Sequence, residues 1–281
     1  METMNPELIK IRTKLAIKRL APREFLTIWI NRENLQDVWD YYAWKRRQTP
    51  PIVLRQPIFL IGCPRSGTSL SARLFSTHPD VANWTEAQRV WDPVNFFDLE
   101  AEHCWEADRV DSVDARRLHA LFEYYRQKHN KPRFMNKNPR NTVRIDYIQA
   151  VFPDAYFVHV IRDGRAVVNS ILKKAEREPF RKNFPFWNFC KPPNWRQFVR
   201  EDPVEQAALQ WREILSYVLA RRQQLAGRYI EYRYEDLCRR PREILKEVFQ
   251  FVGLRADDPI LQAVPEVIES RNDKFRHDLT P

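Results

Sequence analysis

The chain has 281 residues, of which 43% are hydrophobic and 13% aromatic, and it carries a formal charge of +10. This composition excludes a disordered polyelectrolyte, and the length is enough for one large domain with a substantial core. The positive charge favours an anionic partner, which nucleic acid, a lipid surface or a phosphorylated small molecule could each provide. Charge alone does not choose among these three.

The cysteine spacing bears on whether the chain binds a metal, and the lengths of the apolar runs bear on where in the cell the protein lies. The four cysteines stand far apart and form no C-x-x-C pair, so the sequence indicates neither a zinc site nor a disulfide framework. No run approaches the ~18 apolar residues of a membrane span, and charged residues stand where a signal peptide needs an apolar centre. We therefore expect a cytoplasmic protein without a transmembrane segment or a metal site.

The first part of the chain is predicted to be a helical extension, residues 1–50, ahead of a main domain at 51–281. From Pro6 to about Arg47, apolar residues recur at helical spacing and lysines lie off that stripe. A basic amphipathic helix can touch a membrane surface or a partner. We favour the simpler alternative, in which the helix packs on its own domain.

Beyond Pro57, short apolar runs alternate with helical patterns, which is typical of parallel strands joined by crossover helices. The expected strands are residues 58–61, 133–136, 156–161 and 229–232. The expected helices are residues 68–76, 142–151, 165–174, 204–226 and 241–251. The sequence thus predicts an α/β, P-loop-type three-layer fold with a central parallel sheet flanked by helices. The aromatic and proline-rich stretch at 179–203 fits a long loop or lid.

A glycine-bearing loop follows the first of these strands and leads into a helix. This arrangement aims backbone N–H groups and a helix N-terminus at an anion. The spacing from Gly62 to Gly67 matches the G-x-x-x-x-G of nucleoside triphosphatases, but Thr68 stands where those enzymes carry lysine. The cation of this loop is Arg65, so we interpret it as a phosphate loop that differs from the triphosphatase type. A plain glycine turn with a surface arginine is the structural alternative.

A second strand-to-helix junction carries Arg162 at the strand end, and Ser170 falls about two helical turns later. The two side chains are expected to meet one phosphate. Alone, an Arg-Asp-Gly-Arg turn is usually a salt-bridged helix start. Its position downstream of a matching phosphate loop makes the functional interpretation stronger.

The two segments together resemble those of sulfotransferases that use 3'-phosphoadenosine 5'-phosphosulfate (PAPS). Residues 64–70 resemble the family's 5'-phosphosulfate loop, and the second segment resembles R-D-x-R-x-x-x-x-S, which binds the 3'-phosphate in that family. The similarity extends over roughly 57–276. It implies PAPS as donor, adenosine 3',5'-bisphosphate (PAP) as product, and no required metal. The cofactor-binding residues it implies are Arg65, Ser66, Gly67, Thr68, Ser69, Arg162, Ser170, Tyr234, Lys274 and Arg276.

The catalytic base is sought among few candidates. His78 is expected to lie beyond the loop helix, and His159 falls within a buried strand, so both are expected to be structural. Cytosolic small-molecule sulfotransferases carry a histidine soon after a strand-end lysine, but here Lys137 is followed by Asn138 and Pro139. That subgroup's base therefore does not transfer to this chain.

Glu86 is the preferred base, because it aligns with the catalytic glutamate of tyrosylprotein sulfotransferases. An exposed glutamate at a helix start is the alternative. The resemblance implies that Glu86 deprotonates an acceptor hydroxyl while Arg65 and Lys137 stabilise charge on the departing oxygen.

The acceptor is expected to be a hydroxyl on a sugar, a phenol, a lipid or a peptide tyrosine, and no nucleic-acid partner is expected. Homo-oligomerisation is left open. The rival functions are a P-loop kinase or triphosphatase, and a non-catalytic protein that binds nucleic acid or a membrane surface through its basic charge.

Overall fold

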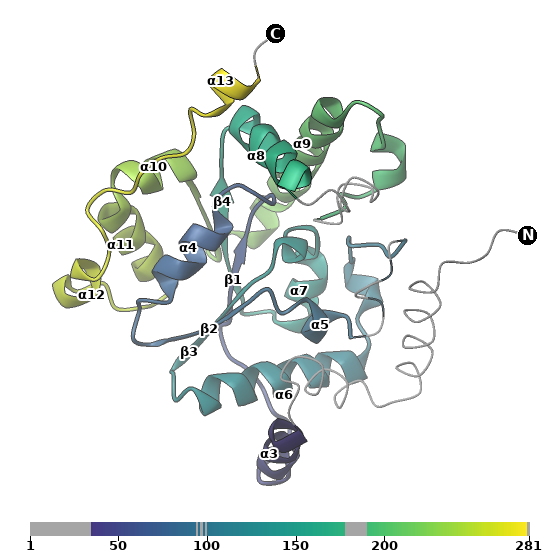
Figure 1. The fold of residues 1–281 in the computed structure, drawn as a ribbon. Helices are drawn as coiled ribbons and strands as arrows, with labels where there is room; N and C mark the ends of the chain where they lie inside the picture. Colours follow the sequence, from purple (N-terminus) through teal and green to yellow (C-terminus); the bar gives the residue numbers. More distant parts are fainter. Residues whose placement is uncertain (1–34, 94, 96–97, 99, 178–189, 280–281) are drawn as a thin grey trace, which may run out of the picture.

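A computed structural model describes residues 35–93, 95, 98, 100–177 and 190–279. Most of the predicted N-terminal helix and the first part of the predicted aromatic loop lie outside these residues. In the part described, five parallel strands form one sheet in the order β2-β3-β1-β4-β5, and helices cover both faces (Figure 1). The predicted α/β fold with a central parallel sheet is confirmed.

The strands differ little from the predicted ranges, with one addition. They are β1 (Ile58–Ile61), β2 (Val81–Thr85), β3 (Arg133–Lys137), β4 (Tyr156–Ile161) and β5 (Tyr229–Arg233). The predicted bounds of β1 and β4 are confirmed, and β3 and β5 each extend one residue further. β2 was not predicted, because it is a short edge strand in which only the first two residues are buried.

The sheet separates two apolar cores, as the alternation of strand side chains requires. Phe59 and Ile61 pack into one core and Ile58 and Leu60 into the other, and all four are fully buried. The first face carries α3 (Leu35–Arg46), α5 (Gln88–Trp91), α6 (Ser112–Lys128), α7 (Ile145–Val151), α8 (Gly164–Arg177) and α9 (Pro203–Arg221). The second carries α4 (Thr68–Phe75), α10 (Tyr234–Arg239), α11 (Pro241–Phe251) and α12 (Asp258–Gln262). A short α13 (Phe275–Asp278) lies near the C-terminus.

The helix predicted at 142–151 is interrupted in the structure, and the interruption has a local cause. Residues Pro139–Val143 form a 3-10 helix, η2, before α7 begins at Ile145. Inside this turn, the hydroxyl of Thr142 accepts a hydrogen bond from the Gly62 amide at 2.9 Å and donates to the Gly62 carbonyl at 3.0 Å. The turn after β3 is thereby fastened to the start of the glycine loop after β1.

The described N-terminal helix, α3, packs on α6. The ring of Tyr41 lies 5.4 Å from that of Tyr124, and Trp44 lies 5.3 Å from the same ring. No helix in the described part of the chain combines the length and the hydrophobicity that crossing a bilayer requires.

Candidate functional site

The glycine loop joins β1 to α4 and requires glycine at both ends. Gly67 has φ +102°, and a Cβ there would lie 2.4 Å from Cδ2 of Tyr234. A Cβ at Gly62, which has φ +155°, would lie 2.7 Å from the carbonyl oxygen of Val160. The loop is therefore pressed against β4 and the Tyr234 ring, where only glycine fits.

The loop also presents donors that helix geometry leaves uncommitted. Gly67 precedes α4 without a side-chain cap, so the first N–H groups of the helix, at Thr68 and Ser69, lack partners within the helix. Ser66 is 1% exposed, and its hydroxyl oxygen has no hydrogen-bond partner among the described residues. A helix N-terminus with uncommitted N–H groups suits an anion.

Arg162 fastens the loop to two other segments from the end of β4. Its guanidinium donates to the carbonyl of Arg65 at 3.0 Å, to the carbonyl of Arg271 at 2.9 Å, and to the side chain of Asn272 at 3.2 Å. It also lies 4.3 Å from the centre of the Tyr234 ring. Burial lowers the pKa of Arg162 from its ordinary value, with the charges of nearby tyrosine and carboxyl groups opposing the shift.

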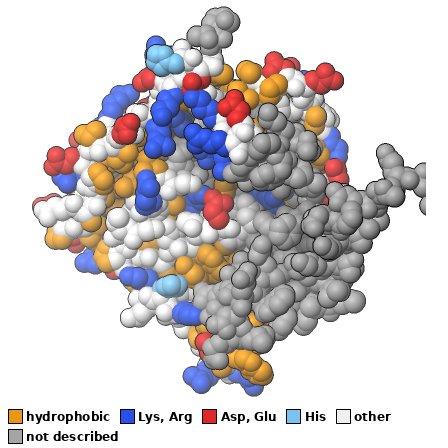
Figure 2. Space-filling view, in the orientation of Figure 1, with side chains coloured by type: hydrophobic (Ala, Val, Ile, Leu, Met, Phe, Trp, Pro, Cys, Tyr) orange, Lys and Arg blue, Asp and Glu red, His pale blue; other side chains and the backbone are white. Residues whose placement is uncertain are grey.

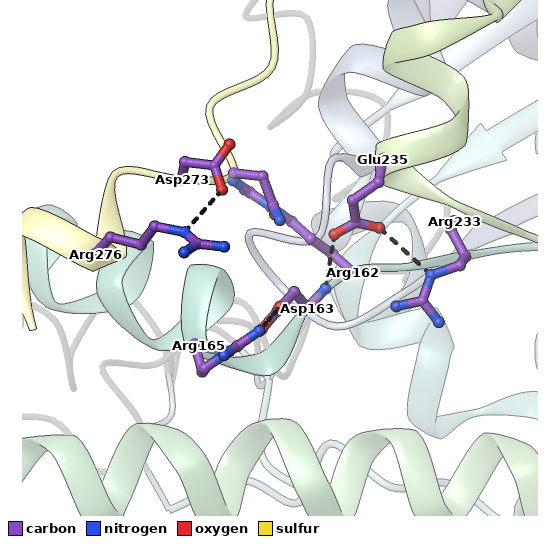
Figure 3. Close-up of polar contacts among 8 residues, drawn as sticks. Arg162, Asp163, Arg165, Arg233, Glu235, Asp273 and Arg276 are labelled. Atoms are coloured by element: carbon purple, nitrogen blue, oxygen red, sulfur yellow. Dashed lines mark hydrogen bonds and ion pairs between the residues drawn. The ribbon is translucent and has the colours of Figure 1, made fainter.

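The turn after Arg162 is held by carboxylates, as Figure 3 shows. Glu235 accepts a hydrogen bond from the Asp163 amide at 3.0 Å, and Arg233 lies 3.7 Å from the same carboxylate. Asp163 in turn pairs with Arg165 at 2.7 Å, and this hydrogen bond holds the pKa of Asp163 below its usual value. The salt-bridged start of α8 therefore coexists with the predicted phosphate site.

Ser170 forms a hydrogen bond with Arg65, the basic residue of the glycine loop. Nε of Arg65 donates to the Ser170 hydroxyl at 3.1 Å, across the gap between the glycine loop and α8. Arg65 has φ +75°, an uncommon backbone conformation for a residue with a side chain. The structure thus brings the two predicted phosphate motifs into direct contact.

A cavity of about 500 Å³ opens between α4, α8, Tyr234 and the C-terminal segment. Eight of the predicted binding residues line it, namely Arg65, Gly67, Thr68, Ser69, Arg162, Ser170, Tyr234 and Lys274. Further basic and polar lining residues were not predicted, namely Arg73, Asn169, Lys173, Lys174, Arg177 and Arg271. Figure 2 shows lysine and arginine side chains gathered in this region, above the centre of the view.

Part of this lining was detectable in the sequence, because Lys173, Lys174 and Arg177 follow Ser170 at helical spacing on α8. Two predicted residues do not line the cavity. Ser66 lies buried beneath the loop, and Arg276 is exposed and pairs with Asp273 at 3.3 Å.

The predicted base and its lysine lie together at the ends of β2 and β3. The ammonium group of Lys137 donates to the Glu86 carboxylate, and the Glu86 amide donates to the Lys137 carbonyl at 2.7 Å. Glu86 has φ +54°, and strain of this kind costs on the order of 1–3 kcal/mol and clusters at functional sites. The Lys137 side chain is 3% exposed whereas that of Glu86 is 57% exposed, so the carboxylate faces solvent from a fixed support.

This pair stands at the same sheet edge as the glycine loop. Lys137 is paired in register with Leu60 of β1 and with Thr85 of β2. The carboxyl ends of parallel strands meet at one edge, where ligands bind in open α/β sheets. Glu86 and Lys137 are not part of the lining of the basic cavity, so the two groups of predicted residues occupy neighbouring parts of this edge.

The two histidines considered as alternative bases, His78 and His159, have structural contacts, as predicted. His78 is buried, with Nε2 2.9 Å from the Arg255 carbonyl oxygen and Nδ1 accepting from the Asp80 amide at 3.1 Å. His159 lies in β4 with Nδ1 2.7 Å from the Tyr229 hydroxyl, and burial lowers its pKa to about 3. Neither ring faces the glycine loop's cavity.

The described residues contain no group of three His, Cys, Asp or Glu side chains that could hold a metal ion.

A family model described as the sulfotransferase family matches residues 57–258. The chain belongs to the sulfotransferase family. Among curated relatives of this sulfotransferase, the nodulation protein NoeE of Sinorhizobium fredii is 26% identical over 212 residues, covering 69% of this chain and 49% of that protein. The protein-tyrosine sulfotransferase of Drosophila melanogaster is 25% identical over 223 residues, covering 73% of this chain and 39% of its own. The chain thus spans half or less of these two relatives.

Solved structures support the fold of this sulfotransferase. A sulfotransferase of Mycobacterium avium matches with a TM-score of 0.53 and 14% identity, over 85% of this chain and 72% of that one. One from Alicyclobacillus acidocaldarius matches with a TM-score of 0.51 and 17% identity, over 81% of this chain and 90% of that one. At such identities the likeness concerns the fold alone. The expected sulfotransferase membership is confirmed by the family model.

Proposed function

We propose that this sulfotransferase moves a sulfuryl group from PAPS to an acceptor hydroxyl, with Glu86 as general base. The observation that carries the proposal is the Glu86–Lys137 pair, held beside the glycine loop at the carboxyl edge of the sheet. A carboxylate makes an effective base only when its position is fixed, and here a buried ammonium and a backbone hydrogen bond fix it.

The donor is assigned to the basic cavity. Amides from Gly67 to Ser69 hold the 5'-phosphate, whereas the Ser66 amide donates to the Cys63 carbonyl at 3.0 Å and its side chain lies outside the cavity lining. Arg162 and Ser170 hold the 3'-phosphate. Arg162 has five N–H groups and donates three hydrogen bonds to protein, which leaves two N–H groups for a phosphate oxygen. Tyr234 supports the loop, and Lys274 and Arg276 contribute from the C-terminal segment.

The chemistry needs a base and cations, and the described residues provide both. Transfer forms a bond between the acceptor oxygen and sulfur and breaks the bond from sulfur to the 5'-phosphate oxygen, leaving PAP. Glu86 takes the acceptor's proton. Lys137 has three N–H donors, so it can hold Glu86 and also stabilise the departing oxygen together with Arg65.

Transfer of label from ³⁵S-PAPS to pooled sugars, phenols, lipids and tyrosine peptides tests the proposal directly. We expect a labelled product in at least one pool, and its absence from all pools would contradict the proposal. Activity should survive exhaustive EDTA treatment, because Arg65 and Lys137 provide the positive charge. Loss of activity that magnesium alone restores, accompanied by ATP hydrolysis, would favour the kinase alternative.

The remaining assignments stay predictions. The acceptor is a sugar, phenol, lipid or peptide hydroxyl, and the cytoplasmic location and the lack of a nucleic-acid partner rest on the sequence. Salt-dependent binding to DNA or anionic vesicles without sulfuryl transfer would support the non-catalytic alternative.

A further inference from the structure

The turn that carries Glu86 is strained, so its conformation depends on the contacts around it. Glu86 has φ +54°, which residues with a side chain rarely adopt. Such a conformation persists only where the surrounding structure determines it from several sides. Two backbone bonds hold the turn itself, because the Glu86 amide donates to the Lys137 carbonyl at 2.7 Å and the Gln88 amide donates to the Glu86 carbonyl at 2.6 Å. The chain before and after the turn is held by other contacts.

The side chain of Asn136 contacts the chain on both sides of this turn. Asn136 lies in β3 directly before Lys137 and is fully buried. Its Nδ2 donates to the Trp84 carbonyl at 2.6 Å, near the end of β2 and just before Glu86. Its Oδ1 accepts from Nε1 of Trp91 at 3.1 Å, in α5 and just after the turn. One amide group therefore holds the chain that enters the strained turn and the chain that leaves it.

The same amide oxygen connects these segments to the glycine loop. Oδ1 of Asn136 also accepts from Nδ2 of Asn141 at 2.8 Å, within η2. Thr142, the next residue, accepts from the Gly62 amide and donates to the Gly62 carbonyl. Asn136 thus belongs to one network with the start of the loop that is proposed to hold the donor. This network sets the position of the Glu86 turn relative to that loop.

Trp91 anchors the network in the first apolar core. Its side chain is buried, and its ring lies 5.7 Å from that of Phe59 in β1 and 5.3 Å from that of Phe122 in α6. An amide oxygen has two lone pairs, and in Asn136 these are used by Trp91 and Asn141. Buried polar networks of this kind rigidify the part of the core that contains them. The support of the exposed Glu86 carboxylate is therefore rigid.

Asn83 shows what another asparagine of the same sheet does. It lies in β2, and its Nδ2 donates to the Ala72 carbonyl at 2.8 Å and to the Ser76 hydroxyl at 2.5 Å. Both acceptors belong to the C-terminal end of α4, on the opposite face of the sheet from Trp91. These bonds fasten a helix to the sheet and do not involve the chain that follows β2.

We propose that Asn136 is a positioning residue for sulfuryl transfer, which fixes Glu86 and Lys137 relative to the glycine loop. The inference rests on the proposed function, in which Glu86 is the base. A general base contributes only within hydrogen-bond reach of the proton that it takes. A displacement of about 1 Å, caused by a change away from the reacting atoms, can cost about 100-fold in rate. Loss of the Asn136 contacts should therefore lower kcat and leave donor affinity nearly unchanged, since its three partners do not line the basic cavity.

The test measures Asn136→Leu in two backgrounds, the parent and Glu86→Gln. Leucine has a similar volume and no hydrogen-bonding group. Turnover is measured with whichever sugar, phenol, lipid or tyrosine peptide takes label from ³⁵S-PAPS, and affinity is measured by titration with PAP. In the parent we expect kcat to fall about 10- to 100-fold, with the Kd for PAP nearly unchanged. In the Glu86→Gln background the same change should cost no more than about twofold, because residues that act as a unit are not additive.

Asn83→Leu is the matched control, because it also removes an asparagine that fastens a strand of this sheet. It should lower the melting temperature and change kcat by the same small factor in both backgrounds. Trp91→Phe guards against misfolding of Asn136→Leu, since it keeps an aromatic ring in the core and removes only one contact with Asn136. Its smaller loss of kcat should likewise disappear in the Glu86→Gln background.

Equal fold losses in the two backgrounds, for Asn136→Leu or for Trp91→Phe, would make Asn136 a purely structural residue. That result would overturn the inference and leave the proposed function standing. Parental kcat in Asn136→Leu, or in Trp91→Phe where the first variant does not fold, would do the same. Parental turnover of Glu86→Gln alone would show that the proposed base is wrong, and the inference would be overturned with it. Absence of transfer to every acceptor would overturn the proposed function and this inference together.

Discussion

The two halves of the sheet's carboxyl edge hold their charged side chains in different ways. At the ends of β1 and β4, Arg162 is buried and anchored by protein acceptors, and many basic residues line one cavity. At the ends of β2 and β3, a single ion pair presents the exposed carboxylate of Glu86. The first half is suited to binding a multiply charged anion and the second to moving a proton. Substitutions should therefore separate donor affinity from turnover.

The largest effect is expected from Glu86→Gln, which keeps the shape of the side chain and removes its basicity. We expect kcat to fall by roughly 10²–10⁴-fold, the usual contribution of a positioned general base, while PAP affinity stays nearly unchanged. Steady-state kinetics measures the fall in kcat, and titration with PAP measures whether the affinity is unchanged. Turnover within a few-fold of the parent would make Glu86 a structural residue at a strand end.

Arg162→Ala tests the half of the sheet edge at the ends of β1 and β4. If Arg162 binds the 3'-phosphate, PAP should stabilise the parent far more than adenosine 5'-monophosphate does, with roughly a tenfold affinity gap or more that the variant loses. The variant also leaves the carbonyls of Arg65 and Arg271 without this donor, so its melting temperature should fall. Arg165→Ala is the control, because its guanidinium is exposed and contacts the Asp163 carboxylate and the Phe275 ring, neither of which lines the cavity. A PAP preference that survives Arg162→Ala would contradict the assignment.

The fold and eight residues that line the basic cavity could be predicted from the sequence, because both depend on local patterns. The strand before Gly62 and the one before Arg162 are short apolar runs, and each is followed closely by residues that line the cavity. β2 was missed because a half-exposed edge strand has little apolar signal. The contact between Lys137 and Glu86 depends on strand order, which local patterns do not reveal.

Gly67→Ala should weaken donor binding by a smaller amount. The new methyl group would meet Tyr234 at 2.4 Å and would force the loop or the ring beneath Arg162 to move. Gly227→Ala is the matched control, since Gly227 also has positive φ but no atom lies within 4 Å of its would-be Cβ. Both variants should lose on the order of 1 kcal/mol of stability from backbone strain. Only Gly67→Ala should also raise the Kd for PAP, and equal Kd values would show that the loop does not depend on this contact.

The smallest effect on activity is expected at His159, which separates a carboxylate base from a histidine base. His159→Gln should keep turnover within a few-fold of the parent, because the ring is buried in β4 and its Nδ1 contacts the Tyr229 hydroxyl. An inactive but folded variant would move the base to histidine and would break the division between the two halves of the edge.

The same substitution should change how stability depends on pH. The folded-state pKa of His159 is lowered to about 3, whereas the unfolded chain takes up this proton near pH 6.5. Between these values the unfolded state binds more protons, so the free energy of unfolding falls as the pH falls. From pH 7 to pH 5 the parent should lose ~2 kcal/mol through this residue, and His159→Gln should lose less by that amount. Denaturant unfolding of both proteins at the two pH values checks the difference. Parallel losses in the parent and the variant would mean that His159 takes up its proton as readily in the folded protein as in the unfolded chain.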